Sequence, residues 1–384
     1  MMNMDAALYI HIPFCVRKCS YCDFYSVKAE DSKVTHFVNM LTKEIGLYAE
    51  NSGIGDFIFK TLYLGGGTPS ILTSRQIASL FDVIRDSFRL SANAEISIEV
   101  NPETVDVNML TDYRETGINR VSIGVQSFFD DDLKVLKRIH SATTAAECVE
   151  LAHQAGFENI SLDLMYAIPG QTLETWLRNI EMAVALSPHH ISFYGLTIED
   201  GTLLQKQLRQ GRYGIVAEEV EREMYLQGVN KLEQANFRRY EVSNSALPGY
   251  ECMHNAMYWD GSPYLGLGPS AHSFWNDQRQ WNTRSLDTYC TVLQKNELPV
   301  RDREILSVEQ QMMESIMLGL RRESGIDMDA FQSRFDIDFR EHYQNTIELL
   351  MAQEVPVIHI HGNQLKLTPP GFVLYDEILY KFVD

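Results

Sequence analysis

Three cysteines, Cys15, Cys19 and Cys22, lie within eight residues near the start of the chain. They follow the spacing C-x-x-x-C-x-x-C, in a loop that comes directly after the first predicted strand. Three soft thiolates from one loop can hold three irons of a cubane and leave the fourth iron without a protein thiolate. The open iron is a binding site for a small molecule. The spacing therefore predicts a 4Fe-4S cluster on these three cysteines.

A zinc site and a set of unrelated buried cysteines are weaker interpretations of the cysteine loop. A closed structural zinc site needs four ligands, and its usual ligand pairings differ from this spacing. Unrelated buried cysteines are disfavoured because Arg17, Lys18 and Ser20 make the loop hydrophilic. Of the remaining cysteines, Cys148 and Cys252 are expected to be buried and structural.

The composition is that of a soluble globular protein. Single hydrophobic cores rarely grow past about 250 to 300 residues, so a chain of 384 residues is expected to form one large and one small domain. No apolar run approaches the roughly 20 residues that span a bilayer. The segment from Met1 to Ala7 carries no basic leader, so we expect a cytoplasmic protein. The net charge of -19 argues against nucleic acid as a partner.

Up to about residue 200, short β-rich segments alternate with longer helical ones, which predicts parallel strands joined by helical crossovers. Six strands are expected, over Ala7–Ile12, Thr61–Leu64, Glu95–Val100, Arg120–Val125, Asn159–Met165 and His190–Leu196.

Alternation within these strands separates an apolar face from a polar one, because successive side chains point to opposite sides of a sheet. Leu8, Ile10 and Ile12 exemplify the face that should meet the helices, whereas Glu95, Ser97 and Glu99 exemplify the other. A filled (β/α) barrel has branched apolar side chains inside. The polar face therefore predicts a partial six-stranded (β/α) barrel with a lumen that holds water or a ligand. An open doubly wound sheet is the alternative.

Three parts of the chain are expected: residues 1–240 as the barrel, 241–300 as an irregular extension, and 301–384 as a small helical domain. In the last part, helices near 308–322, 327–335 and 339–353 precede a hairpin over 357–368, an order that resembles a winged helix. Winged helices often bind DNA, but the acidic balance of the chain favours a packing or lid role.

A second motif, Gly65-Gly-Gly-Thr-Pro69, follows the second strand. Such a turn lets backbone groups approach a ligand closely. Together, the cysteine loop and this turn resemble the radical-SAM superfamily. In that superfamily the open iron binds the amino and carboxylate groups of S-adenosylmethionine (SAM), and an electron from the cluster cleaves the sulfonium to give a 5'-deoxyadenosyl radical.

The resemblance continues over about the first 300 residues towards the porphyrin and heme branch of the superfamily. It implies contacts to SAM from residues that match the branch position by position. Tyr21 would touch the adenine, and Thr197 matches a further contact less closely. The remaining implied contacts are Tyr9, Gly66, Gly67, Thr68, Glu99, Gln126, Arg138 and Asp163. Of these, Tyr9, Glu99, Gln126 and Asp163 also lie on the polar face of the strands.

Two features separate the members of this branch. Oxygen-independent coproporphyrinogen III dehydrogenases typically carry a further cysteine where this chain has Phe24. The stretch His254-Asn-Ala-Met-Tyr-Trp259 matches the H-N-x-x-Y-W motif of the HemW family of heme chaperones. An exposed imidazole can ligate heme iron, and the neighbouring aromatic side chains can pack on a macrocycle. For a histidine beside aromatics, a packed and hydrogen-bonded side chain is the alternative, and a structural role is also open for His272.

The resemblance thus implies a heme chaperone that binds heme, a 4Fe-4S cluster and SAM, with apo-hemoproteins, such as respiratory ones, as clients. Contact with a membrane would be peripheral and through a client, and the oligomeric state is open, with a homodimer as one option. A radical-SAM enzyme, such as a coproporphyrinogen dehydrogenase, is the alternative function, since the cluster loop does not reveal whether SAM is cleaved productively.

Overall fold

The computed structural model describes residues 4–51 and 54–382 of the chain. Met1 to Asn3, where the absence of a basic leader was noted, lie outside the described residues. No described helix is long and apolar enough to cross a membrane.

The six predicted strands are present and form the parallel centre of a large sheet. Their hydrogen-bonded order follows their order in the sequence. They are β1 (Met4–Ile12), β4 (Phe57–Gly66), β5 (Leu90–Val100), β6 (Arg120–Gln126), β7 (Ile160–Tyr166) and β8 (His190–Gly195). The prediction of a parallel sheet with crossovers is confirmed.

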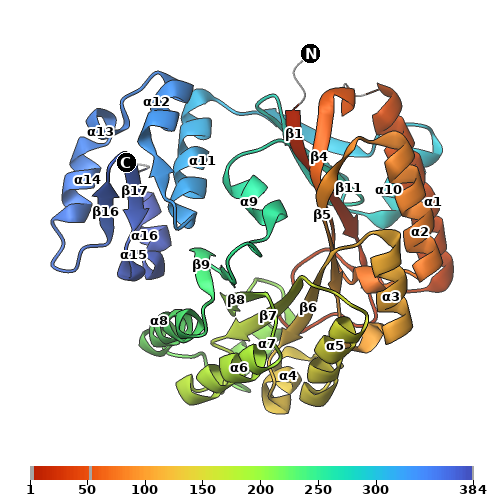
Figure 1. The fold of residues 1–384 in the computed structure, drawn as a ribbon, viewed down its shortest axis with the longest axis horizontal. Coiled ribbons are helices and arrows are strands. Elements are labelled where there is room, and N and C mark those ends of the chain that lie inside the picture. The colour runs from red at the N-terminus through yellow and green to blue at the C-terminus, as the bar shows by residue number, and fades with distance from the viewer. Residues whose placement is uncertain (1–3, 52–53, 383–384) are drawn as a thin grey trace.

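Helical crossovers connect these strands and cover the outer side of the arc that they form (Figure 1). Several of these helices have ordinary caps: the Thr73 hydroxyl accepts a bond from the backbone of Gln76 at the start of α2, and Gly117 ends α3 with φ of 105°. The crossover helices are α1 (Asp31–Asn51), α2 (Ser74–Ser87), α3 (Val107–Thr116), α4 (Asp130–Leu136), α5 (Ala142–Gln154) and α6 (Leu173–Ala185). A doubly wound sheet would carry such helices on both faces, so the partial barrel describes the fold better.

The two faces of the strands differ as the alternation predicted. Leu8, Ile98 and Leu162 are fully buried in one continuous core beneath the helices. Burial of each such side chain contributes about 1.5–3 kcal/mol, so this face holds the barrel together. The opposite face encloses the lumen.

Further strands extend the sheet at both ends, and they correct the expectation that residues 241–300 are irregular. The stretch contains the helices α9 (Met253–Trp259) and α10 (Leu286–Gln294), and most of the added strands. At one end, β11 (Tyr264–Leu267) pairs in parallel with β1 and continues into an antiparallel meander of β12 (His272–Trp275), β13 (Gln278–Asn282) and β14 (Val300–Ile305). At the other end, β10 (Asn244–Ala246) and β9 (Arg238–Glu241) follow β8. The strands β10 to β14 were missed because they are short and are stabilised by pairing with distant strands, which local composition does not reveal.

Short elements complete the rim of the barrel. The two-residue strands β2 (Phe14–Cys15) and β3 (Val27–Lys28) close the cysteine loop, and three 3-10 turns, η1 (Ile54–Asp56), η2 (Pro69–Ile71) and η3 (Pro102–Thr104), adjoin strand ends. The helices α7 (Leu203–Arg209) and α8 (Glu218–Gln234) follow β8.

The C-terminal unit has the winged-helix-like order that was expected. It packs against β9 of the sheet. The guanidinium of Arg239, on β9, lies 3.7 Å from the centre of the Phe372 ring and forms an ion pair with Glu323 at 2.7 Å. The unit contains α11 (Val308–Arg321), β15 (Ile326–Asp327), α12 (Met328–Phe335), α13 (Phe339–His342), α14 (Gln344–Met351), β16 (Ile358–His361), β17 (Gln364–Leu367), α15 (Pro369–Val373) and α16 (Tyr375–Tyr380).

Candidate functional site at the mouth of the barrel

A cavity of about 550 Å³ opens at the carboxyl ends of the parallel strands. The cysteine loop forms one wall, the glycine-rich turn another, and the polar face of the strands the floor. Parallel strands present their carboxyl ends at one edge of the sheet, so residues far apart in the sequence meet there. All of the predicted site residues except Thr197 line this cavity.

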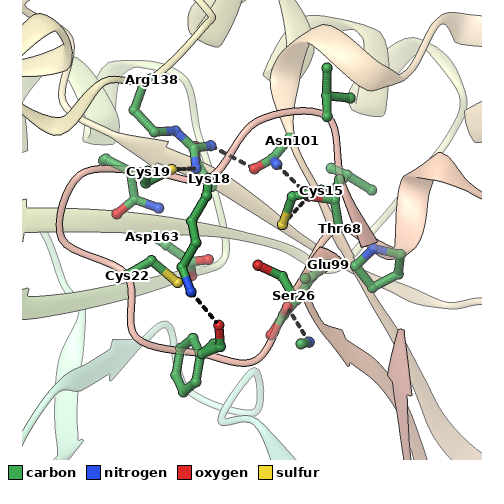
Figure 2. A pocket seen from close by; sticks show the side chains of 18 of the residues that line it. Cys15, Lys18, Cys19, Cys22, Ser26, Thr68, Glu99, Asn101, Arg138 and Asp163 are labelled. Atoms are coloured by element: carbon green, nitrogen blue, oxygen red, sulfur yellow. Dashed lines mark hydrogen bonds between the residues drawn. The ribbon is translucent and has the colours of Figure 1, made fainter. Parts of the chain in front are cut away.

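The cysteine loop curves around the cavity, and the side chains of Cys15, Cys19 and Cys22 point inward from different sides (Figure 2). Pairing of β2 with β3 joins the two ends of the loop. Ser20 fixes the middle, because its backbone N–H donates to the Leu136 carbonyl at 3.0 Å and its hydroxyl donates to the Val135 carbonyl at 2.8 Å. The three thiols are therefore held around the same cavity.

Two hydrogen-bond donors reach the sulfur atoms. The Thr68 hydroxyl lies 3.7 Å from the sulfur of Cys15, and the Arg138 guanidinium lies 3.6 Å from that of Cys19. Burial raises the pKa of Cys22 to about 11 and also raises that of Cys15, so both thiols keep their protons until a metal replaces them.

Three thiols from one loop, with donors to their sulfurs, fit an iron–sulfur cluster. In the described ranges, no three Cys, His, Asp or Glu side chains are grouped as ligands of a single metal ion.

The glycine-rich turn follows β4 and faces the cysteine loop. Gly66 has φ of 108°, a conformation that favours glycine, and a Cβ atom there would lie 2.5 Å from the His11 ring. Its backbone N–H donates to a Glu99 carboxylate oxygen at 3.2 Å. The turn can therefore bring backbone groups close to a ligand, as its composition predicted.

Two buried carboxyl groups, Glu99 on β5 and Asp163 on β7, face the same space. Burial raises the pKa of Glu99 to about 7 and that of Asp163 to about 6, and for Glu99 the nearby Asp163 is a further cause. Glu99 also accepts a bond from the Tyr63 hydroxyl at 3.0 Å, and Asp163 accepts one from Ser122 at 3.0 Å. A cationic ligand would offset the cost of ionising both carboxyl groups, which suits the ammonium and sulfonium groups of SAM.

This carboxyl pair predicts a pH dependence of stability in the ligand-free chain. Because the folded-state pKa of Glu99 is raised, its protonated form favours folding at low pH, and that contribution is lost as the pH rises from about 4.5 to about 7. We expect Glu99→Gln to flatten the fall in melting temperature across this range. Glu158→Gln, at an exposed position, should leave the fall unchanged. An equal pH dependence in wild type and Glu99→Gln would contradict the assignment.

Gln126 and Arg138 also line the cavity. Gln126 ends β6 in the left-handed region, with φ of 66°, and its side-chain oxygen accepts a bond from the Tyr194 hydroxyl at 2.8 Å. Such a backbone in a residue other than glycine costs about 1–3 kcal/mol and is common at binding sites. Arg138 is held by the Gly124 carbonyl at 2.8 Å and by the Asn101 side chain at 2.5 Å.

His254 lies on α9, inside the barrel, and has the packed and hydrogen-bonded environment that was the alternative to an exposed imidazole. It is buried, with its Nδ1 atom 2.7 Å from the Thr61 hydroxyl and its Nε2 atom 3.1 Å from the Tyr258 hydroxyl. Its ring stacks on Tyr63 at 4.9 Å between centroids. Burial lowers the pKa of His254 to about 3, so the ring is neutral. Glu95 holds the start of α9, because its carboxylate accepts the backbone N–H groups of Met253 and His254, each at 3.0 Å.

Thr197 is the one predicted contact that the structure leaves outside the cavity. The strand β8 ends at Gly195, so Thr197 falls beyond its end and is exposed. The lining residues that were not among the predicted contacts include Asn101 and Tyr194. Tyr194 lies on β8 with the parity of Ser192, which also lines the cavity, so alternation along the sixth strand could have identified it.

Both the barrel and the C-terminal unit are similar to known protein families. The family model described as the Radical SAM superfamily matches residues 9–183, and the model of the HemN C-terminal domain matches residues 306–374. Among solved structures, coproporphyrinogen III oxidase (HemN) from Escherichia coli, a radical-SAM enzyme, superposes with a TM-score of 0.86 over 99% of this chain and 90% of its own, at 22% identity. At that identity the likeness concerns the fold.

Several curated relatives are similar over most of the chain. Heme chaperone HemW of Bacillus subtilis is 34% identical over 98% of this chain and 98% of its own. Heme chaperone HemW of Escherichia coli is 40% identical over 69% of each chain. A mitochondrial radical S-adenosyl methionine domain-containing protein 1 of Danio rerio is 31% identical over 98% of this chain and 86% of its own.

Proposed function

The chain belongs to the HemW family within the radical-SAM superfamily, and from this premise we propose that it is a heme chaperone. It binds heme, a 4Fe-4S cluster and SAM, and it delivers the heme to apo-hemoproteins. The observation that carries the proposal is the 34% identity with HemW of Bacillus subtilis over 98% of both chains. The barrel cavity supports it with the residues that the two cofactors need.

In this proposal Cys15, Cys19 and Cys22 hold the cluster. Their inward orientation and the donors from Thr68 and Arg138 support the assignment. Hydrogen bonds to cluster sulfurs stabilise their negative charge and tune the reduction potential.

SAM occupies the rest of the cavity. When bound at a reduced cluster, it can supply a 5'-deoxyadenosyl radical. The backbone of Gly66 and Gly67 approaches its amino end, and the carboxylates of Glu99 and Asp163 balance its positive charge. The further proposed contacts are Tyr9, Tyr21, Thr68, Gln126 and Arg138, all of which line the cavity. Thr197 does not line the cavity, so it could contact SAM only if the segment after β8 moved towards the cavity.

In this proposal His254 is a heme-linked residue, provided that one of its ring nitrogens becomes free. Both of its ring nitrogens have hydrogen-bond partners, so iron ligation requires the Nε2 atom to exchange the Tyr258 hydroxyl for iron. Tyr258→Phe removes that competitor with little change in shape. If His254 ligates iron, Tyr258→Phe should bind heme at least as tightly as wild type, whereas His254→Ala should bind it more weakly.

A radical-SAM enzyme acting on coproporphyrinogen III is the second candidate, favoured by the overall likeness to HemN. Phe24 weighs against it, because this side chain stands exposed at the cavity mouth where the dehydrogenases typically carry a cysteine. A heme chaperone transfers heme to an acceptor, whereas the enzyme would convert coproporphyrinogen III, so the two functions can be told apart by their products.

The test is anaerobic reconstitution with iron and sulfide, followed by heme titration, by transfer of bound heme to an apo-hemoprotein, and by assay with coproporphyrinogen III under reducing conditions. We expect stoichiometric heme binding, transfer to the acceptor and no conversion of coproporphyrinogen. Turnover of coproporphyrinogen without heme binding would replace the chaperone proposal by the enzyme.

We propose a cytoplasmic location, respiratory apo-hemoproteins as clients that bring it to the membrane surface, and no nucleic-acid partner, in keeping with the net charge of -19. The three-part division at residues 240 and 300 is proposed as functional, with the last part in a packing or lid role. Light scattering with and without heme tests for a homodimer.

A further inference from the structure

A second cavity, of about 560 Å³, lies beside the cluster cavity and shares part of its wall, including the proposed SAM contacts Tyr9, Gly66 and Glu99. Tyr9, Phe24, Gly66, Glu99 and Tyr258 line both cavities, so the two spaces are neighbours. The meander that follows β11 and the helix α11 of the C-terminal unit complete the second one. Its volume falls in the range of about 300–1,000 Å³ that is typical of small-molecule sites.

Aromatic rings dominate the walls of this second cavity. Tyr258 and Tyr264 meet edge to face at 4.7 Å between centroids, and Phe274 lies 6.3 Å from Tyr264. Tyr25 and Trp259 add further aromatic surface. The indole Nε1 atom of Trp259 is buried without a hydrogen-bond partner in the described ranges. Aromatic rings can pack against an apolar macrocycle through their faces and their edges.

Two histidines line the second cavity, and they differ in whether their nitrogens are available. The Nδ1 atom of His11 lies 3.0 Å from the Tyr9 hydroxyl, and its Nε2 atom lies 3.3 Å from the Tyr25 carbonyl. For His272, on β12, no side-chain hydrogen bond is found among the described residues, and its ring stacks on Trp281 at 5.8 Å. Partial burial lowers the pKa of His272, which favours the neutral ring that binds iron.

A polar hollow adjoins this wall. It shares Phe24, Tyr25, Ser270 and His272 with the second cavity and carries two exposed arginines, Arg284 and Arg301. Among the described residues, Arg284 reaches only the Asp23 carbonyl, at 3.5 Å, and the Tyr25 ring, at 5.8 Å. Arg301 has no side-chain partner in the part of the chain that the structure describes.

Arg279, which lines the second cavity, is less available to bind an acidic group than Arg284 and Arg301 are. The guanidinium of Arg279 is already paired with Glu304, at 3.1 Å, and with Glu314. Carboxylates bind arginine through paired, charge-assisted hydrogen bonds. In a chain with a net charge of -19, Arg284 and Arg301 are therefore a local site for an acidic group.

We infer that heme binds in the second cavity, with the neutral imidazole of His272 as an iron ligand and with its propionates directed to Arg284 and Arg301. The inference rests on the proposed function, since it gives the heme cargo a site of its own beside the cluster. It assigns His272 a role in binding in place of a structural one. It also makes His272 the iron ligand in place of His254, which lines the cluster cavity and not the second one.

The test is an anaerobic titration of the reconstituted chain with hemin and, in parallel, with metal-free protoporphyrin IX. His272→Ala should weaken hemin binding by on the order of tenfold and remove the signature of histidine ligation from the absorption and paramagnetic resonance spectra. Its affinity for protoporphyrin IX should stay unchanged. His272→Met should retain hemin with an altered ligand signature, and His359→Ala, at an exposed histidine of the C-terminal hairpin, should match wild type.

The propionate site is tested with Arg284→Gln/Arg301→Gln. We expect both hemin and protoporphyrin IX to bind on the order of tenfold more weakly, and the protoporphyrin dimethyl ester to bind as it does to wild type. Arg209→Gln/Arg238→Gln removes the same charge at exposed positions elsewhere and should have no effect.

The results of these titrations distinguish a wrong heme site from a wrong chaperone proposal. If wild type binds hemin and His272→Ala binds it with the same affinity and spectrum, the inference is overturned and the chaperone proposal stands. If the two arginine pairs weaken binding equally, the propionate assignment is overturned. If wild type does not bind hemin, the proposed function and the inference fail together.

Discussion

Replacing Cys15, Cys19 and Cys22 together by alanine is expected to lower the iron content of the reconstituted chain from about four atoms towards none. These three thiols line one cavity and are the proposed protein ligands. Binding of SAM should be lost with the cluster, because its amino and carboxylate groups need the open iron. Iron and sulfide analysis, together with the spectrum of the reduced cluster, measures the effect.

Cys290→Ala is the matched control for this loss. Cys290 is buried in α10 and does not line the cavity, so its removal should leave the iron content unchanged. Full iron in the triple variant would show that the cluster is held elsewhere. Equal loss of iron in Cys290→Ala would point to a general failure of folding.

The second large effect is expected at Gly67. A Cβ atom there would lie 2.5 Å from the carbonyl oxygen of Phe14 and 2.8 Å from that of Ile12. Both are backbone atoms that lead into the cysteine loop, so Gly67→Ala must push the loop away from the turn. We expect a loss of about 2–4 kcal/mol in the free energy of unfolding of the apo chain, measured by urea denaturation, and poor cluster loading.

Gly46→Ala is the control at a glycine with free space. Gly46 lies inside α1, and apart from its own helix backbone no described atom lies within 4 Å of the place that a Cβ would take, so alanine fits. Alanine also favours the helix by about 0.8–1.0 kcal/mol over glycine, and the variant should be slightly more stable than wild type. If Gly67→Ala proved as stable as Gly46→Ala, the close packing of the turn on the loop would be wrong.

Local patterns predicted the barrel well because its physical signals are local. Alternation along single strands separated Leu8 from Tyr9 and Ile98 from Glu99, and the structure buries the apolar member of each pair beneath the helices and directs the polar one to the lumen. The strand β11 gave no such signal. It has only four residues, and its parallel pairing with β1 joins parts of the chain that are more than 250 residues apart.

Residue type and spacing were enough to predict the strand faces, the three-cysteine loop and the glycine turn, since each of these is set within a few residues. By contrast, contacts between distant segments of the chain decide which histidine ring nitrogens are free to bind iron. His254 and His272 look alike as histidines near aromatics, yet Thr61 and Tyr258 bond to the first, while the ring of the second only stacks on Trp281 among the described residues. Folding brings such hydrogen-bond partners together from far along the chain, and local composition cannot identify them.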